Sequence, residues 1–118
     1  MSRRPLSRGD VVITRFPFTD LSGAKPRPAL VIGADSSGSD CIVAYISKVV
    51  PSRAGPCDFV VHPRDPEFAL TGLRFPSVFR MDKIATVSRT LMTSRLGRVG
   101  PGIRREIDGR LRRALDLR

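Results

Sequence analysis

The sequence predicts a mainly β (α+β) protein: a small, mostly antiparallel β-barrel with an amphipathic helix at its C-terminal end. Short apolar, β-branched runs alternate with turn-rich segments through most of the 118 residues. The last segment, residues 103–117, instead repeats apolar residues at helical spacing. Several short strands followed by one helix are typical of a small barrel with a helix packed on it. The length fits one domain covering residues 1–118.

The first two strands are expected at residues 11–13 and 29–32, which are apolar and largely β-branched. The segment between them, FPFTDLSGAKPRP, is rich in turn residues and too long for a tight hairpin. Pro26 and Pro28 flank Arg27 in this loop and restrict its backbone on both sides. An arginine fixed at the entrance of a strand suits a phosphate or its transition state. The alternative is a surface arginine in a stiff loop.

Three more strands are expected along the middle of the chain, the last of them continuing or bending near Asp82. A polar turn at residues 34–40 and a loop at 51–56 separate them, and residues 63–72 are irregular with one helical turn. Residues 88–98 are expected to hold a short helix before a Gly-Pro-Gly break. The three strands are expected at residues 41–47, 58–62 and 77–87.

The final segment is the clearest helix. Apolar residues recur at every fourth position and form one stripe, so this stripe is expected to pack on the barrel. The other faces carry five arginines, which a solvated surface explains better than a dedicated nucleic-acid helix. The stripe comprises Ile103, Ile107, Leu111 and Leu115, and the arginines are Arg104, Arg105, Arg110, Arg112 and Arg113.

The formal net charge of +10 points to a polyanionic or acidic partner. An anionic membrane surface is the competing interpretation, but no run approaches the ~20 apolar residues of a spanning helix. The first ten residues lack the apolar region of a secretory signal, so we expect a cytoplasmic protein. Cys41 and Cys57 are expected to be small thiols rather than a disulfide, because the cytosol is reducing. They have only His62 nearby, which is too few ligands for zinc.

The sequence lacks several sets of catalytic residues, and each absence excludes a class of reaction. With His62 as the single histidine, a ribonuclease that uses two histidines as acid and base is excluded. No paired carboxylates, phosphate-binding glycine loop or nucleophile elbow occurs at a persuasive spacing. The chain also has no Asn or Gln, so the bidentate amide contact to adenine is not available. The remaining candidates for catalysis are arginine and hydroxyl side chains. Ser47 ends the third expected strand, where its hydroxyl can reach toward Arg27.

Three segments, which occur in the same order along the chain as in the family, resemble the MazF/PemK type II toxin–antitoxin ribonucleases. They are RGDVVITRFPFTDLSGAKPRPALVIG, IVAYISKV and GLRFPSVFRMDKIATVSRTLMTSRLGRV, so the resemblance runs from about Gly9 to Val99. It implies an SH3-like barrel that forms a homodimer and cuts single-stranded RNA, most plausibly mRNA, with no metal ion and no cofactor. The essential arginine of the family falls on Arg27, and its threonine at the end of the third strand falls on Ser47, where a hydroxyl is kept.

The resemblance also has departures. Many relatives carry Gln where this chain has Lys83, so the base preference of those relatives does not transfer. The first loop is more compact and lacks a Gly-Ser-Glu stretch. From the resemblance we expect Arg27 and Ser47 to be catalytic and a further set of residues to contact the substrate. That set comprises Phe16, Phe18, Thr19, Asp20, Lys25, Lys48 and Lys83.

The physical chemistry agrees with this assignment. RNA cleavage by its own 2′-OH needs alignment and charge stabilisation rather than a protein nucleophile. Arg27 can donate paired hydrogen bonds to the phosphorane, and Ser47 can donate another. The general base stays open, with Asp20 a weak candidate because it shares the loop. Phe16 and Phe18 alternate around Pro17, so one can stack on a base; the alternative is that it seals the dimer or the edge of the core.

Two other classes of function stay open. One is a gyrase poison similar to CcdB, and the other is a barrel that binds RNA or an acidic peptide without catalysis. Neither explains an arginine held between two prolines. For the nuclease, the family resemblance and the positive charge imply a cognate antitoxin whose acidic, disordered C-terminal tail folds across the site.

Overall fold

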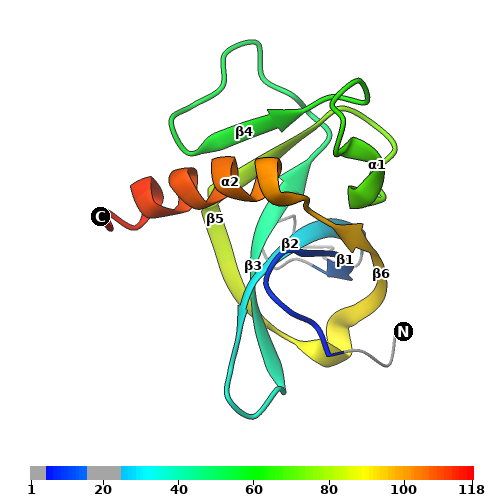
Figure 1. Cartoon of the computed structure of the whole chain (residues 1–118). Helices are drawn as coiled ribbons and strands as arrows, with labels where there is room; N and C mark the ends of the chain where they lie inside the picture. The colour runs from blue at the N-terminus through cyan, green and yellow to red at the C-terminus, as the bar shows by residue number, and fades with distance from the viewer. Residues whose placement is uncertain (1–4, 16–24) are drawn as a thin grey trace.

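A computed structural model describes residues 5–15 and 25–118. Within them the chain forms one six-stranded sheet whose neighbouring strands all run antiparallel, in the order β4-β5-β3-β2-β1-β6. The sheet curls strongly, and α2 lies across it beside β4 and β5 (Figure 1). The elements are β1 (Asp10–Arg15), β2 (Pro26–Ala34), β3 (Asp40–Ser47), β4 (Asp58–Val61), α1 (Phe68–Thr71), β5 (Ser77–Ser88), η1 (Arg89–Leu91), β6 (Met92–Arg98) and α2 (Pro101–Ala114).

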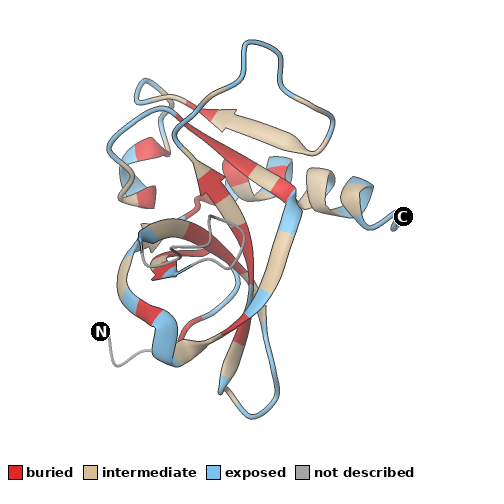
Figure 2. Ribbon diagram, turned by 180° about the vertical axis from the view of Figure 1, so that it is seen from behind, coloured by how far each residue is buried: buried red, intermediate tan, exposed pale blue. Residues whose placement is uncertain are grey.

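The curled sheet buries both of its faces, which explains why β1 and β2 read as continuous apolar runs. Neighbouring residues on a strand point to opposite faces, so Val11 and Leu30 join the core under α2 while Val12 and Val31 join a second core. The buried positions follow the middles of the strands and the first half of α2 (Figure 2). The described residues therefore form two apolar clusters, one on each face of the sheet.

Most of the expected elements are present, but residues 88–98 are not a short helix. They form the 3-10 turn η1 and then a sixth strand, β6, which pairs with the open edge of β1. The Arg95 guanidinium forms an ion pair with the buried Asp10 carboxylate, with Nη2 3.3 Å from Oδ2. Pairing with β1 and this ion pair favour the strand, and both come from residues far away in the sequence. The expected fifth strand continues past Asp82 as β5, and its register against β3 shifts between Arg80 and Ile84.

The terminal helix is confirmed, although its apolar stripe is buried only in part. Ile103 and Ile107 are buried, and Leu111 packs against the same cluster. Leu115 is 46% exposed because α2 ends at Ala114 and leaves this residue at the C-cap. In the part of the chain that the structure describes, no helix is long and apolar enough to cross a membrane.

Two glycines let α1 pack directly against β6. Gly72 ends α1 with a left-handed backbone (φ +74), and a Cβ there would lie 2.2 Å from the carbonyl oxygen of Leu96. A Cβ on Gly97 would lie 2.1 Å from the carbonyl oxygen of Leu70. The two backbones touch, so no larger residue fits at either position without moving one of the elements. This contact fixes the start of the segment that joins α1 to β5.

Glu67 links α1 to α2. Its carboxylate accepts hydrogen bonds from the backbone N–H groups of Gly102 (3.0 Å) and Ile103 (2.8 Å) in the first turn of α2. These groups have no partner within the helix, and the positive end of the helix dipole favours a carboxylate there. The two hydrogen bonds lower the pKa of Glu67 below its ordinary value of 4.5.

We expect Gly97→Ala to lower the free energy of unfolding by about 2–3 kcal/mol, because its methyl group would press on a backbone carbonyl. The matched control is Gly109→Ala in α2, where a Cβ meets nothing within 4 Å. That change is expected to raise the free energy of unfolding by roughly 0.5–1 kcal/mol. Urea denaturation of both variants measures the difference. A Gly97→Ala protein as stable as the wild type would contradict the close contact.

We expect Glu67→Gln to be less stable than the wild type at pH 7, because an amide oxygen carries no charge for the helix dipole. The folded-state pKa of Glu67 is lowered, so its carboxylate stabilises the fold above about pH 4.5. This contribution disappears as the pH falls through the folded-state pKa. Urea midpoints of the two proteins should therefore converge on acidification. A constant gap at all pH values would refute the ionic contribution.

Candidate active site

A cleft of about 480 Å³ opens where β2 and β3 separate. The last pair between these strands is Ala29 opposite Tyr45, although β2 begins earlier and β3 ends later. Continued by two residues, the same register places Arg27 opposite Ser47. Directly opposite residues share one face of a sheet. Both residues line the cleft, so the structure brings together the two residues for which the sequence predicts a catalytic role.

Arg27 lies in a strand rather than in a loop, which differs from the sequence prediction. β2 begins at Pro26, and Arg27 pairs with Thr14 of β1. The prolines on both sides are tolerated because β2 is paired only with β1 at this end. The Nε atom of Arg27 is buried and, among the described residues, has no hydrogen-bond partner. The guanidinium carries further N–H donors, so Arg27 can donate to an anion in the cleft.

Ser47 ends β3 with its hydroxyl held in place. Its Oγ accepts a hydrogen bond of 3.0 Å from the backbone N–H of Val49. A hydroxyl that accepts one hydrogen bond can still donate its own hydrogen, so Ser47 can donate to an oxygen in the cleft. The neighbouring Lys48 is exposed, and its Nζ lies 5.5 Å from the centroid of the Phe75 ring.

The electrostatic character of the cleft is one-sided. Its lining includes the cations Arg27, Lys48 and Arg74, and the described residues that line it include no carboxylate and no histidine. Charges of one sign in a concave surface with apolar walls concentrate the field and attract the opposite charge. The cleft is therefore suited to a polyanion such as the backbone of a nucleic acid.

The second wall of the cleft was not foreseen from the sequence. It consists of residues 72–75, which follow α1, together with Ser77 and with Leu96 of β6. Within it Arg74 and Phe75 are exposed. A signal was present, since an adjacent arginine and phenylalanine stand between the turn residues Gly72 and Pro76. Because these two residues are far from Arg27 in the sequence, local patterns did not show that all three line the same cleft.

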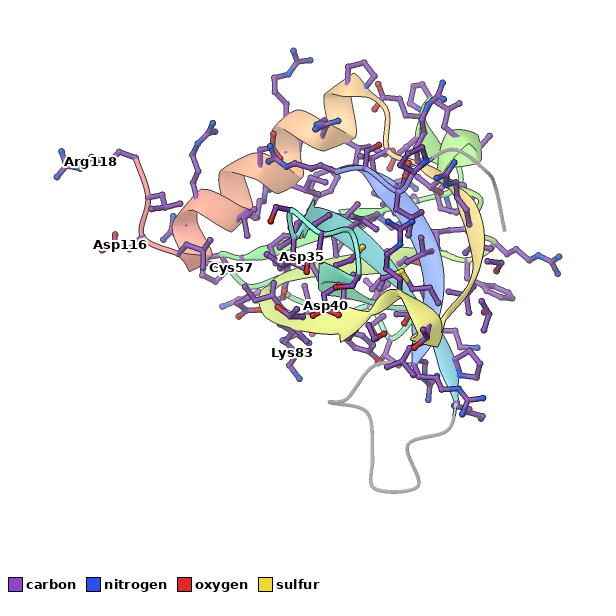
Figure 3. All side chains as sticks on the ribbon, turned by 90° about the horizontal axis from the view of Figure 1, so that it is seen from below. Asp35, Asp40, Cys57, Lys83, Asp116 and Arg118 are labelled. Carbon is purple, nitrogen blue, oxygen red and sulfur yellow. The ribbon has the colours of Figure 1, made fainter. Side chains whose placement is uncertain are left out.

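Other predicted substrate contacts are not brought to this cleft. Lys83 is exposed where β5 shifts register against β3, and it points outward from the sheet (Figure 3). Lys25 is exposed next to Pro26 but is not part of the lining. The four remaining residues, Phe16, Phe18, Thr19 and Asp20, lie outside the described residues.

The residues considered for metal or thiol chemistry lie apart from this cleft. His62 lines a separate hollow between β4 and α2. Cys41 and Cys57 form no disulfide, as expected, and burial raises the pKa of the Cys41 thiol. Across residues 5–15 and 25–118, no three His, Cys, Asp or Glu side chains gather closely enough to hold a metal ion.

Comparisons with known proteins agree with this geometry. A family model described as the PemK-like, MazF-like toxin of type II toxin-antitoxin system matches residues 7–115. The chain is 33% identical over 96 residues to a Mycobacterium bovis protein named endoribonuclease MazF2 and to a Mycobacterium tuberculosis protein named endoribonuclease MazF6. The alignment covers 80% of this chain and 82% of each relative.

Solved structures share the fold. A mycobacterial endoribonuclease in complex with its cognate antitoxin aligns with a TM-score of 0.69 at 23% identity, covering 94% of this chain and 95% of that chain. The Mycobacterium tuberculosis toxin MazF-mt6 aligns with a TM-score of 0.71 at 20% identity, covering 92% of this chain and 98% of that chain. They confirm the expected barrel-like fold with its terminal helix, although β4 and β6 leave the sheet open. With the match over residues 7–115, the chain belongs to the PemK-like, MazF-like toxins of type II toxin–antitoxin systems.

Proposed function

We propose that this toxin is an endoribonuclease that cleaves single-stranded mRNA in the cleft around Arg27. The observation that carries the proposal is the presence of Arg27 and Ser47 in one cleft whose described lining has three cations and no carboxylate. The relatives named endoribonucleases support RNA cleavage over a gyrase poison or a binding barrel without catalysis. Because RNA is the substrate, we place the activity in the cytoplasm.

The chemistry follows from what the cleft supplies. The 2′-OH of the RNA attacks the adjacent phosphorus, the bond to the 5′-oxygen breaks, and the products carry a 2′,3′-cyclic phosphate and a 5′-OH. Arg27 donates paired hydrogen bonds to the phosphorane oxygens, and Ser47 donates another. Each such donor is worth about 3 kcal/mol in the transition state. The described lining holds no carboxylate or histidine to take the 2′-OH proton, and the earlier candidate Asp20 lies outside the described residues.

Lys48 and Arg74 bind the RNA backbone in this scheme. Both line the cleft and both are exposed, so they can reach phosphates beside the one that is cleaved. The lysine ammonium group acts as a point charge and the arginine guanidinium as a two-pronged hydrogen-bond donor. Both contact phosphates, whichever base the nucleotide carries. They contribute affinity rather than sequence preference. The other exposed arginines on α2 raise the general attraction for RNA from a distance.

We further propose that the active form is a homodimer that is neutralised by an antitoxin. One cleft is short for several nucleotides, and two copies about a two-fold axis extend it into a groove. The positive lining suits an acidic, disordered tail of the antitoxin that folds over Arg27. A neighbouring structure of the family, solved with its cognate antitoxin, supports such a partner.

Arg27→Ala should abolish RNA cleavage while the protein stays folded, since a loss of about 10²–10³-fold is typical for one transition-state donor and Arg27 supplies more than one. Arg27→Lys should also fail because a point charge does not replace the fork. Ser47→Ala should slow cleavage strongly. Single-turnover rates on a mapped RNA site measure this, with the exposed Arg113→Ala on α2 as the control. A folded, fully active Arg27→Ala protein would remove Arg27 from the mechanism.

RNA with a single 2′-deoxy group at the cleaved nucleotide should resist cleavage, because it lacks the nucleophile. Chelators should leave the rate unchanged, and added salt should lower it steeply because backbone charge supplies much of the affinity. Sequencing the new 5′ ends first maps the site, and end-group analysis should find a 2′,3′-cyclic phosphate. An absolute need for Mg²⁺, or cleavage of the 2′-deoxy substrate, would show that this mechanism is wrong.

RNA and antitoxin should exclude each other, because both place negative charge over Arg27. Titrating the antitoxin tail into toxin bound to non-cleavable RNA should release the RNA in proportion. Size-exclusion chromatography of the toxin alone should give the mass of a dimer. A ternary complex that retains full cleavage would refute the shared site.

A further inference from the structure

We infer that Phe75 is a stacking platform for one base of the RNA and that Lys48 serves the phosphate next to that base. The inference rests on the proposed function and adds a residue to it. Phe75 lines the same cleft as Arg27, yet its side chain is 57% exposed. A large apolar ring in solvent beside a cationic site is the arrangement with which proteins hold unpaired bases.

The position of Phe75 is fixed although its ring is exposed. The hydroxyl of the buried Ser77 donates a hydrogen bond of 2.8 Å to the Phe75 carbonyl oxygen. Pro76 follows directly and limits the backbone of Phe75 to extended conformations. At the other end of the segment, Gly72 is packed against β6, and the Leu73 N–H donates to the Thr71 hydroxyl at 3.1 Å. A ring held in this way loses little freedom when a base stacks on it.

Lys48 gives the ring an electrostatic partner. Its Nζ lies 5.5 Å from the ring centroid, within the range of a cation–π interaction. At an exposed site such a pair is weaker than the stacking of a base on an aromatic ring. A base can therefore replace the ammonium group, which is then available to pair with a phosphate. The pair holds both side chains at the mouth of the cleft until RNA arrives.

An RNA base fits this surface better than a peptide side chain does. Arg27, Lys48 and Arg74 line the same cleft as the ring, and the described lining has no carboxylate to attract a basic partner. An acidic side chain would find the charges but would leave the exposed ring in water. A nucleotide satisfies both because its phosphate is charged and its base is flat and apolar on both faces.

The sequence offers a clean probe because the chain has no Trp. In Phe75→Trp the single indole should be quenched when a non-cleavable RNA binds, namely the mapped site with a 2′-deoxy group at the cleaved nucleotide. The matched control is Leu117→Trp at the C-terminal end, where the native side chain is 60% exposed and lies outside the cleft. Its fluorescence should stay unchanged. Equal quenching of both indoles, or of neither, would overturn the proposal.

A second measurement locates the base. Phe75→Ala should bind the same RNA about tenfold to a hundredfold more weakly, whereas Phe75→Tyr should bind as the wild type does. Replacing each nucleotide in turn with an abasic one should weaken binding to the wild type at one position in particular. That loss should vanish in Phe75→Ala, because the base and the ring act as a pair. Without any such coupled position the platform does not exist.

The outcomes separate this inference from the proposed function. If the wild type cleaves and Arg27→Ala does not, the nuclease assignment stands whatever Phe75 does. Unchanged RNA affinity of Phe75→Ala would overturn the stacking platform alone. Dissociation of the free dimer in Phe75→Ala, seen by size-exclusion chromatography, would show that the ring belongs to an interface between copies and would also overturn it.

Discussion

The antiparallel register between β2 and β3 is the constraint on which the candidate site depends. Pairing of Ala29 with Tyr45 sets the face for Arg27, two residues before Ala29 in β2, and for Ser47, two residues after Tyr45 in β3. A shift by one residue would turn Arg27 to the opposite face and separate it from Ser47. The register is secured by the two cores, because Leu30 and Val31 must enter different clusters. Packing on both faces of the sheet thus sets the geometry of two polar residues at its end.

The second wall of the cleft depends on a different kind of contact. Gly72 and Gly97 let the backbone of α1 rest on β6, and Glu67, just before α1, bonds to the first turn of α2. The short helix is therefore held on two sides, by a close backbone contact with β6 and by the Glu67 carboxylate on α2. The segment that follows this helix brings Phe75 to the cleft that Arg27 also lines. Stability and the shape of the cleft come from the same contacts.

The charge of the protein acts at two levels. The net charge of +10 attracts any polyanion and says little about where it binds. The cleft proposed as the binding site combines three cations with a described lining that contains no carboxylate. Some arginines outside it form ion pairs, as Arg80 does with Asp58 at 2.8 Å between Nε and Oδ1. The concave, apolar-walled setting of the cleft cations, rather than the total charge, makes the cleft the candidate site.

The sequence by itself determined the strands with continuous apolar runs, the terminal helix, and the choice of Arg27 and Ser47 as candidate catalytic residues. These follow from local periodicity and from motifs that a single segment carries. Tertiary structure alone decided that β6 is a strand, because its partner β1 is far away in the chain. Tertiary structure likewise left Leu115 exposed, placed Lys83 outside the cleft and brought Phe75 into the lining of the cleft. Such outcomes depend on which distant backbones meet, and local sequence carries no record of that.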